Sequence, residues 1–271
     1  MDQALETVRR YYDENAAAEW DRLEVSPFEF TLTTWMMDKY IRPGDSILDV
    51  GGGPGRYALH WAQKGCAVTL VDLSSGNTAL ARQKAEQAGV ELRIHTRNCL
   101  ELDALDLGEF DHVFLMGPLY HLQKEADRAA AVEACLRRLK PGGNLYVSFI
   151  LLIAALIYDL QNPGQLLEDV KNPIFAQVTD ALASGGDFLG EGFTEVYFYH
   201  QDNILPFMGQ FGLKQLHLFG QEGFLAPNKG DLLRRDPAEL QLWLELAKRY
   251  LELPELLSWS EHAMYIGQKP Q

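Results

Sequence analysis

Residues 46–57, with the sequence Ser-Ile-Leu-Asp-Val-Gly-Gly-Gly-Pro-Gly-Arg-Tyr, decide the fold of this chain. The apolar run at 47–50 fits a short buried strand of a parallel sheet. The glycines that follow predict a sharp turn, and the pattern at 57–64 predicts a helix that Gly65 ends. Glycines let the backbone approach a ligand, and free amides at a helix start favour an acceptor or anionic group. The stretch therefore predicts a strand, a turn and a helix that together hold a ligand.

The next strand, at 67–72, ends in an acid about 20 residues after the first glycine, the spacing of a carboxylate that binds a ribose diol. A dinucleotide-binding fingerprint would need glycine at position 56, where this chain has Arg56. The remaining pattern is Gly51-x-Gly53-x-Gly55 preceded by Asp49. This pattern resembles the class I S-adenosylmethionine (SAM)-dependent methyltransferases, and Asp72 matches their ribose-binding acid.

A second motif resembles the same family. An apolar helix pattern at 132–139 is followed by Lys-Pro-Gly-Gly at 140–143 and a strand at 144–150. The resemblance covers residues 44–150 closely and 200–270 loosely. It implies an α/β fold with a doubly wound, Rossmann-like sheet of seven mostly parallel strands, an antiparallel last strand and a helical cap.

The alternation of strands and helices divides the chain into core and cap segments. We expect an N-terminal helical cap at 1–41, a SAM-binding core at 42–150, its continuation at 200–225 and a final core strand at 259–271. Helical insertions are expected at 151–199, as a lid, and at 226–258. The apolar run at 147–158 is shorter than the roughly 20 residues that span a membrane. It predicts a buried strand that continues into a cap helix.

The composition argues against several classes of partner. The chain has 24 Lys and Arg against 38 Asp and Glu, a net charge of −14. Such a surface repels nucleic acid and anionic membranes. The three cysteines have no metal-binding spacing, which is typical of reduced thiols, and the first residues lack the pattern of a signal peptide. The sequence therefore predicts a cytoplasmic protein with no metal, no nucleic-acid partner and no membrane partner.

The resemblance also implies which residues hold the cofactor. Asp49 and the glycine backbone would bind the methionine end, and Asp72 would bind the ribose hydroxyls. Leu73 and Cys99 would line the adenine, with Asn98 at its edge. The full expected set, whose last member adds a backbone contact near the sulfonium, is Asp49, Gly51, Gly52, Gly53, Asp72, Leu73, Asn98, Cys99 and Met116.

Candidates for the reacting side follow the fourth strand, at 110–116, because ligands of open parallel sheets bind beyond the carboxyl ends of the strands. His121 is the candidate base, and Tyr120 would orient or stack on the acceptor. Alternatively, His121 supports the next helix and Tyr120 is packed in the core. Tyr12 and Trp20, on an amphipathic helix at 3–20, and His200 are the expected acceptor-binding residues. Structural roles in packing or capping are their alternatives.

The resemblance implies in-line methyl transfer from SAM to a small molecule through nitrogen, oxygen or carbon. No Asn-Pro-Pro-aromatic motif follows the fourth strand, which disfavours the branch that methylates DNA bases or glutamine. Two alternatives stay open, a catalytically idle SAM-binding protein and a nucleotide-dependent oxidoreductase on the same sheet. The cap helices could form either a lid or the interface of a homodimer.

Overall fold

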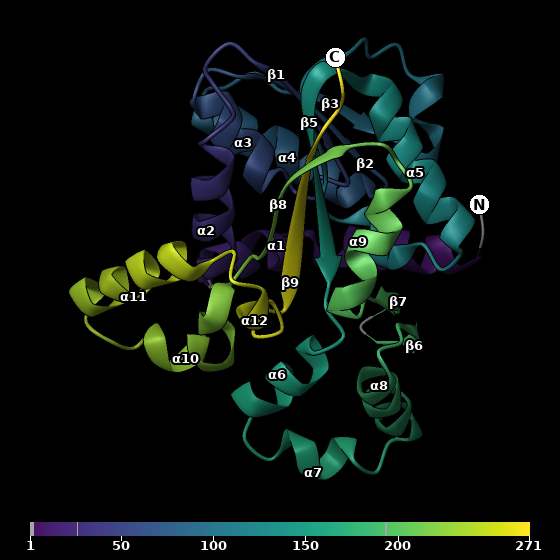
Figure 1. Cartoon of the computed structure of the whole chain (residues 1–271). Coiled ribbons are helices and arrows are strands. Elements are labelled where there is room, and N and C mark those ends of the chain that lie inside the picture. Colours follow the sequence, from purple (N-terminus) through teal and green to yellow (C-terminus); the bar gives the residue numbers. More distant parts are fainter. Residues whose placement is uncertain (1–2, 26, 193) are drawn as a thin grey trace.

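A computed structural model describes residues 3–25, 27–192 and 194–271 of the chain. Its main sheet has seven strands in the order β3-β2-β1-β4-β5-β9-β8 (Figure 1). Strands β1 to β5 are parallel, and β9 is antiparallel to both of its neighbours. The expected doubly wound sheet with an antiparallel last strand is confirmed. The strands are β1 (Ser46–Val50), β2 (Ala67–Asp72), β3 (Arg93–Thr96), β4 (Phe110–Leu115), β5 (Leu139–Ile150), β8 (Lys214–Gly220) and β9 (His262–Gln268).

Successive residues of the central strands face two separate cores, since side chains alternate across a sheet. Leu48 faces the core that contains Cys135 of α5 (Glu125–Arg138). Ile47 faces the core that contains Leu32 of α2 (Phe28–Met37) and Trp61 of α3 (Arg56–Gln63). Because both faces are covered by helices, the central strands are continuous apolar runs, as the sequence predicts for a parallel sheet.

The glycine turn after β1 needs a residue without a side chain. Gly51 has a φ of +71°, and a Cβ there would lie 2.4 Å from the Cδ atom of Pro118. A larger residue would therefore be strained and would also collide with the segment that follows β4. The turn holds the ends of β1 and β4 close together, where parallel sheets bind ligands.

The N-terminal helix α1 (Gln3–Val25) is fixed at the start of α4 (Ser75–Ala88). The Oδ1 atom of Asp13 accepts hydrogen bonds from the Ser74 hydroxyl at 2.7 Å and the Gly76 amide at 2.9 Å. These hydrogen bonds hold α1 across the carboxyl ends of the strands (Figure 1). In the described part of the chain, no helix is long and apolar enough to cross a membrane.

The segment after β5 differs in part from the mostly helical insertion that we expected. Helices α6 (Ala154–Gln161), α7 (Gln165–Asp169) and α8 (Pro173–Ser184) are followed by an antiparallel hairpin of β6 (Phe188–Glu191) and β7 (Glu195–Phe198). The expectation missed this hairpin, although Val, Tyr and Phe at 196–198 favour a strand. The helices lie beyond the end of β5 (Figure 1).

The remaining elements complete the core and the second insertion. They are η1 (Cys99–Ala104), η2 (Pro118–His121), α9 (Gln201–Gly209), η3 (Gly223–Asn228), α10 (Lys229–Leu232), α11 (Pro237–Tyr250) and α12 (Pro254–Leu257).

Candidate active site

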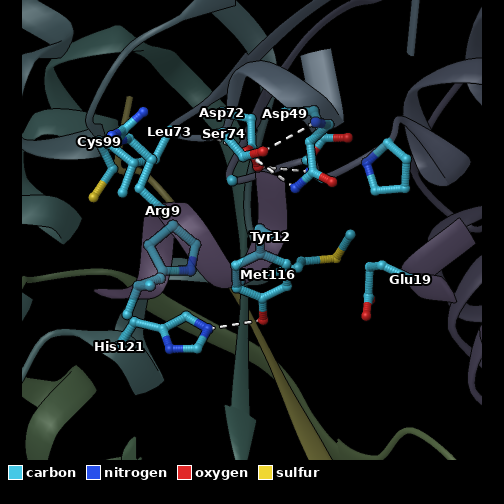
Figure 2. Close-up of a pocket in the computed structure, with 18 of the residues that line it drawn as sticks. Arg9, Tyr12, Glu19, Asp49, Asp72, Leu73, Ser74, Cys99, Met116 and His121 are labelled. Carbon is cyan, nitrogen blue, oxygen red and sulfur yellow. Dashed lines mark hydrogen bonds between the residues drawn. The ribbon is translucent and has the colours of Figure 1, made fainter. Parts of the chain in front are cut away.

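A cavity of about 120 Å³ opens beyond the carboxyl ends of β1, β2 and β4, and we call it the glycine-loop pocket (Figure 2). All nine residues expected to bind the cofactor line it. Residues that the sequence analysis did not single out, including Arg9, Ser74 and Asn77, complete its wall. Of these, Ser74 could have been found from the sequence, because a serine two residues after the strand-ending acid is a typical N-cap, and Ser74 caps α4.

Asp49 is a buried acid at the base of this pocket. Its side chain has two oxygens without a hydrogen-bond partner among the described residues, and the residue is 1% exposed. Burial, together with repulsion from Asp72, raises the pKa of Asp49 to about 7. The nearby backbone amide of Ala58 partly opposes this rise, although it does not form a hydrogen bond with the carboxylate. An ammonium group would supply the missing charge and hydrogen bonds, so the residue fits the amino group of a methionine moiety.

Asp72 ties the glycine turn to the start of α4. Its Oδ2 atom accepts a hydrogen bond from the Gly53 amide at 2.8 Å, and its Oδ1 atom accepts from the Ser74 amide at 2.8 Å and the Asn77 side chain at 3.2 Å (Figure 2). Burial raises the pKa of Asp72, and these donors oppose the rise. A carboxylate has about four acceptor sites, so capacity for a ligand hydroxyl is left.

The glycine turn fits a ligand at close range. A Cβ on Gly52 would lie 2.7 Å from the Oδ2 atom of Asp49. A side chain at position 52 would therefore collide with the acid, so only glycine lets the backbone of the turn pass this close to Asp49.

The far end of the pocket has a fixed amide and a buried thiol. The Oδ1 atom of Asn98 accepts a hydrogen bond of 3.0 Å from the Leu100 amide, which holds the side chain at the start of η1. Burial raises the pKa of Cys99 to about 12. The thiol is therefore protonated at neutral pH and suits packing rather than nucleophilic attack.

His121 joins three parts of the molecule. The hydroxyl of Tyr12 on α1 lies 2.9 Å from its Nε2 atom (Figure 2), and the hydroxyl of Thr194 lies 3.2 Å from its Nδ1 atom. Burial lowers the pKa of His121 to about 3, so the ring is neutral at physiological pH. An efficient general base has a pKa near the working pH. The low pKa and the two hydrogen bonds therefore favour a structural role for His121, in which it links α1, η2 and the segment before β7, over a role as a base.

Of the other candidates, two line the pocket and two are buried elsewhere. Tyr12 and Tyr120 line the glycine-loop pocket, whereas Trp20 and His200 do not. The Trp20 ring lies 4.8 Å from the Arg56 guanidinium and 4.5 Å from the Lys84 ammonium. His200 caps α9, where its Nδ1 atom accepts from the Asp202 amide. The structure does not bring Trp20 and His200 to the site.

A second cavity, of about 980 Å³, lies between the end of β5, the start of β9 and helices α6 to α8, and we call it the lid cavity. The two cavities share part of their walls, formed by Tyr12, Glu19, Arg22, Glu29 and Tyr120. The apolar residues of the lid cavity come mainly from residues 151–199 and from the end of β5. They are Ile150, Ala154, Ala155, Tyr158, Ile174, Phe175, Val178, Phe188 and Phe198. The two cavities therefore lie next to each other at these five residues.

The polar end of the lid cavity was not found from the sequence. It contains Glu29, Glu222 and His262, which each offer one ligand-type atom within 4.8 Å of the others. Glu29 comes from α2, Glu222 from the turn between β8 and η3, and His262 from the start of β9. No sequence spacing joins them, which is why a sequence search for a metal site does not detect this group.

Sequence comparisons match the core of the chain. A family model described as "Methyltransferase domain" matches residues 47–143. The ubiquinone biosynthesis O-methyltransferase of Sodalis glossinidius (strain morsitans) is 37% identical over 105 residues, which are 39% of this chain and 41% of that protein. The same enzyme of Azotobacter vinelandii (strain DJ / ATCC BAA-1303) is 31% identical over 138 residues, 48% of this chain and 57% of that protein. The chain spans about half the length of these relatives.

Solved structures share the fold over nearly the whole chain. Magnesium protoporphyrin IX methyltransferase from Synechocystis PCC 6803, with bound SAM, has a TM-score of 0.58 at 14% identity and covers 99% of this chain and 98% of its own. The 1,6-didemethyltoxoflavin-N1-methyltransferase of Burkholderia thailandensis has a TM-score of 0.57 at 14% identity, with 98% and 89% covered. With the glycine turn and the acid after β2, the sequence matches show that residues 47–143 belong to a class I SAM-dependent methyltransferase domain, and the solved structures show that the chain shares the fold of such enzymes.

Proposed function

We propose that this protein transfers a methyl group from SAM, bound in the glycine-loop pocket, to a small molecule bound in the lid cavity. The observation that carries this proposal is the shared wall of the two cavities, which five residues form. Methyl transfer needs the acceptor atom and the methyl carbon in line and close together, so a junction between two ligand sites is the geometry required.

The chain's own residues would hold the cofactor along the glycine-loop pocket. Asp49 would pair with the ammonium group, and Asp72 would accept from the ribose hydroxyls with its remaining lone pairs. Leu73 and Cys99 would line the adenine with Asn98 at its edge, and the backbone of Met116 would lie near the sulfonium. Bound SAM supplies the methyl group and its own leaving group, so the protein's task is chiefly orientation.

The acceptor is proposed to be a partly apolar organic molecule. The volume of about 980 Å³ and the aromatic and aliphatic wall of the lid cavity suit such a molecule. The relatives are ubiquinone biosynthesis O-methyltransferases, and the fold neighbours are methyltransferases named for magnesium protoporphyrin IX and 1,6-didemethyltoxoflavin. These names all refer to small molecules, and the net charge of −14 disfavours a nucleic-acid acceptor.

The segment at 151–199 is proposed to act as a lid over the acceptor, with His121 as a positioning residue. Thr194 meets His121 from the lid side and Tyr12 meets it from α1. Closure would exclude water and bring the acceptor toward the glycine-loop pocket.

Calorimetric titration with SAM and with S-adenosylhomocysteine tests the cofactor site. We expect micromolar binding of both, weakened roughly tenfold or more in Asp72→Ala, because a buried polar partner is lost. Glu245→Gln, on the exposed face of α11, is the matched control. Release of S-adenosylhomocysteine with an acceptor present would separate the enzyme from an idle binder. Absence of binding to both molecules would overturn the proposal.

A further inference from the structure

A buried ion pair lies at the polar end of the lid cavity. Glu222 is 2% exposed, and its Oε1 atom lies 2.6 Å from the Nδ1 atom of His262. Its Oε2 atom accepts hydrogen bonds from the Ser260 hydroxyl and from the amides of Glu261 at 3.1 Å and His262 at 3.0 Å. These donors hold the carboxylate in one orientation, so the imidazole ring has a fixed position beside the cavity.

The attraction within this pair keeps both groups ionised at neutral pH. Although burial opposes both charges, it is outweighed by the His262 charge, which lowers the pKa of Glu222 to about 2, and by the Glu222 charge, which raises that of His262 to about 9. A protonated imidazole donates from both nitrogens. Because Nδ1 is bound to Glu222, the Nε2–H group is the donor left for a ligand.

Glu29 supplies an acceptor next to this donor. Its Oε2 atom accepts a hydrogen bond of 2.7 Å from the Nη1 atom of Arg22, and its Oε1 atom lies 3.4 Å from the Tyr57 hydroxyl. One oxygen of Glu29, one oxygen of Glu222 and one ring nitrogen of His262 lie within 4.8 Å of one another, so the carboxylate of Glu29 and the His262 ring border the same gap. Glu29 also lines the glycine-loop pocket, whereas His262 lines the lid cavity.

The charges around this gap select the kind of group that fits. The charges of Glu29 and Glu222 are balanced by those of Arg22 and His262, and Glu19 adds a further negative charge 3.0 Å from Arg22. An anion would therefore be repelled. A hydroxyl group both donates and accepts, which matches a carboxylate on one side and an N–H group on the other.

We propose that Glu29 and His262 bind a hydroxyl group of the methyl acceptor, with Glu29 accepting its hydrogen and His262 donating to its oxygen. This inference rests on the proposed function, since it assumes that the lid cavity takes the acceptor. The ligand class is a phenol or alcohol on an apolar body. The hydroxyl would lie at the wall shared by the two cavities, which Glu29 helps to form.

A divalent cation is the competing occupant of this gap. Carboxylate and imidazole groups ligate metals only when deprotonated. Here the proton on His262 must leave first, and Glu222 already accepts from several donors. We therefore expect no tight metal binding, and the test includes it as an outcome.

Probes with one skeleton separate the possibilities. Titrations of 2-naphthol, 2-methoxynaphthalene and 2-naphthoate are made on the full chain with saturating S-adenosylhomocysteine, and Mn²⁺ is titrated separately. The methoxy probe cannot donate a hydrogen bond, and the naphthoate carries a negative charge. We expect 2-naphthol to bind roughly tenfold more tightly than either, because a hydrogen bond to a charged group discriminates by about that factor.

Two variants remove one partner each. In His262→Asn the amide can still donate to Glu222 but the Nε2–H donor is lost, and Glu29→Gln removes the anionic acceptor. Both should reduce the preference for 2-naphthol to about twofold or less, whereas Glu245→Gln should retain it. Thermal unfolding checks that each variant is folded, and if one fails to fold the other decides.

The inference is overturned by an unchanged preference in a folded variant, by a lack of 2-naphthol binding, by tighter binding of 2-naphthoate, or by stoichiometric Mn²⁺ binding that Glu222→Gln abolishes. Binding of S-adenosylhomocysteine to the wild type is measured first. If it fails, the proposed function fails; if it succeeds and the hydroxyl preference is absent, only this inference fails.

Discussion

The carboxylate of Asp72 at the end of β2 accepts a hydrogen bond of 2.8 Å from the amide of Gly53 in the glycine turn. Through this contact the residue expected to bind ribose also fixes the loop expected to bind the methionine end. Loss of the carboxylate should therefore affect both the cofactor affinity and the stability of the apo protein.

Replacement of Asp72 separates these two effects. Asp72→Ala leaves three donors without their partner, so we expect a loss of about 1–3 kcal/mol in unfolding free energy, together with the weaker SAM binding described above. Asp72→Asn keeps one acceptor oxygen and should lose less stability. Urea denaturation and calorimetry on the same samples provide both numbers. Equal unfolding free energies for Asp72→Ala and wild type would contradict the structural role.

The glycine turn makes a prediction with an internal control. Gly51→Ala forces a side chain into a positive φ and onto Pro118, whereas Gly44→Ala, at a φ of +94°, meets nothing within 4 Å. Gly44→Ala should cost about 1–2 kcal/mol, the penalty of the left-handed region alone. Gly51→Ala should cost roughly 1–3 kcal/mol more because of the collision. Denaturant unfolding measures both, and similar losses would show that the segment after β4 yields easily.

These predictions use the part of the fold that the sequence predicts best. The glycine turn, the acid after β2 and the apolar runs of the central strands are contiguous, so their local pattern determines their place in the sheet. The hairpin β6–β7 was harder to predict from the sequence, because each of its strands has only four residues.

The polar end of the lid cavity shows a different limit of prediction from the sequence. Glu29, Glu222 and His262 meet only because the sheet order places the turn after β8 beside the start of β9, and because α2 packs against η3. None of these residues has a local signature. Conversely, Trp20 lies on the same helix as Tyr12 but faces Arg56 and Lys84. Helical phase alone does not say which aromatic residue faces a cavity.

The Glu222–His262 pair predicts a pH-dependent contribution to stability. The pKa of Glu222 falls from 4.5 to about 2, so its contribution is present above pH 4.5 and is lost as the pH falls toward 2. The pKa of His262 rises from 6.5 to about 9, so its contribution is present below pH 6.5 and is lost as the pH rises through 9. Glu29 and Arg22 also act on His262, with opposite signs.

The difference in unfolding free energy between wild type and His262→Asn isolates this pair from other titrating groups. We expect the difference to be largest near pH 5–6 and to shrink toward pH 2 and pH 10. Urea denaturation across this range measures it. A difference that is constant with pH would mean that the pair is not ionised in the folded protein.

The contact of Tyr12 with His121 predicts an effect on the N-terminal helix. Tyr12→Phe removes the hydroxyl 2.9 Å from Nε2 and should cost about 1 kcal/mol. It should also speed proteolysis within α1, because one tie between α1 and η2 is lost. Tyr158→Phe, at a ring that is 52% exposed, is the matched control. Unchanged proteolysis within α1 would contradict this role of the contact, and a shifted pH profile of turnover would indicate that His121 serves as a base.

Asp49 predicts opposite effects on stability and on binding. Its pKa in the folded chain is about 7, above the ordinary 3.8, so folding increasingly penalises the carboxylate as the pH rises from 3.8 to 7. Asp49→Asn removes this charge and should make the apo protein more stable than wild type at pH 8, with little difference at pH 4.

The same variant lacks the anion that would pair with the ammonium group of SAM. Its affinity for SAM at pH 8 should therefore fall roughly tenfold or more. Urea denaturation at both pH values, with calorimetry at pH 8, measures the two effects. A variant that is less stable than wild type at pH 8 would contradict the unpaired state of Asp49, and unchanged SAM affinity would contradict its proposed contact with the cofactor.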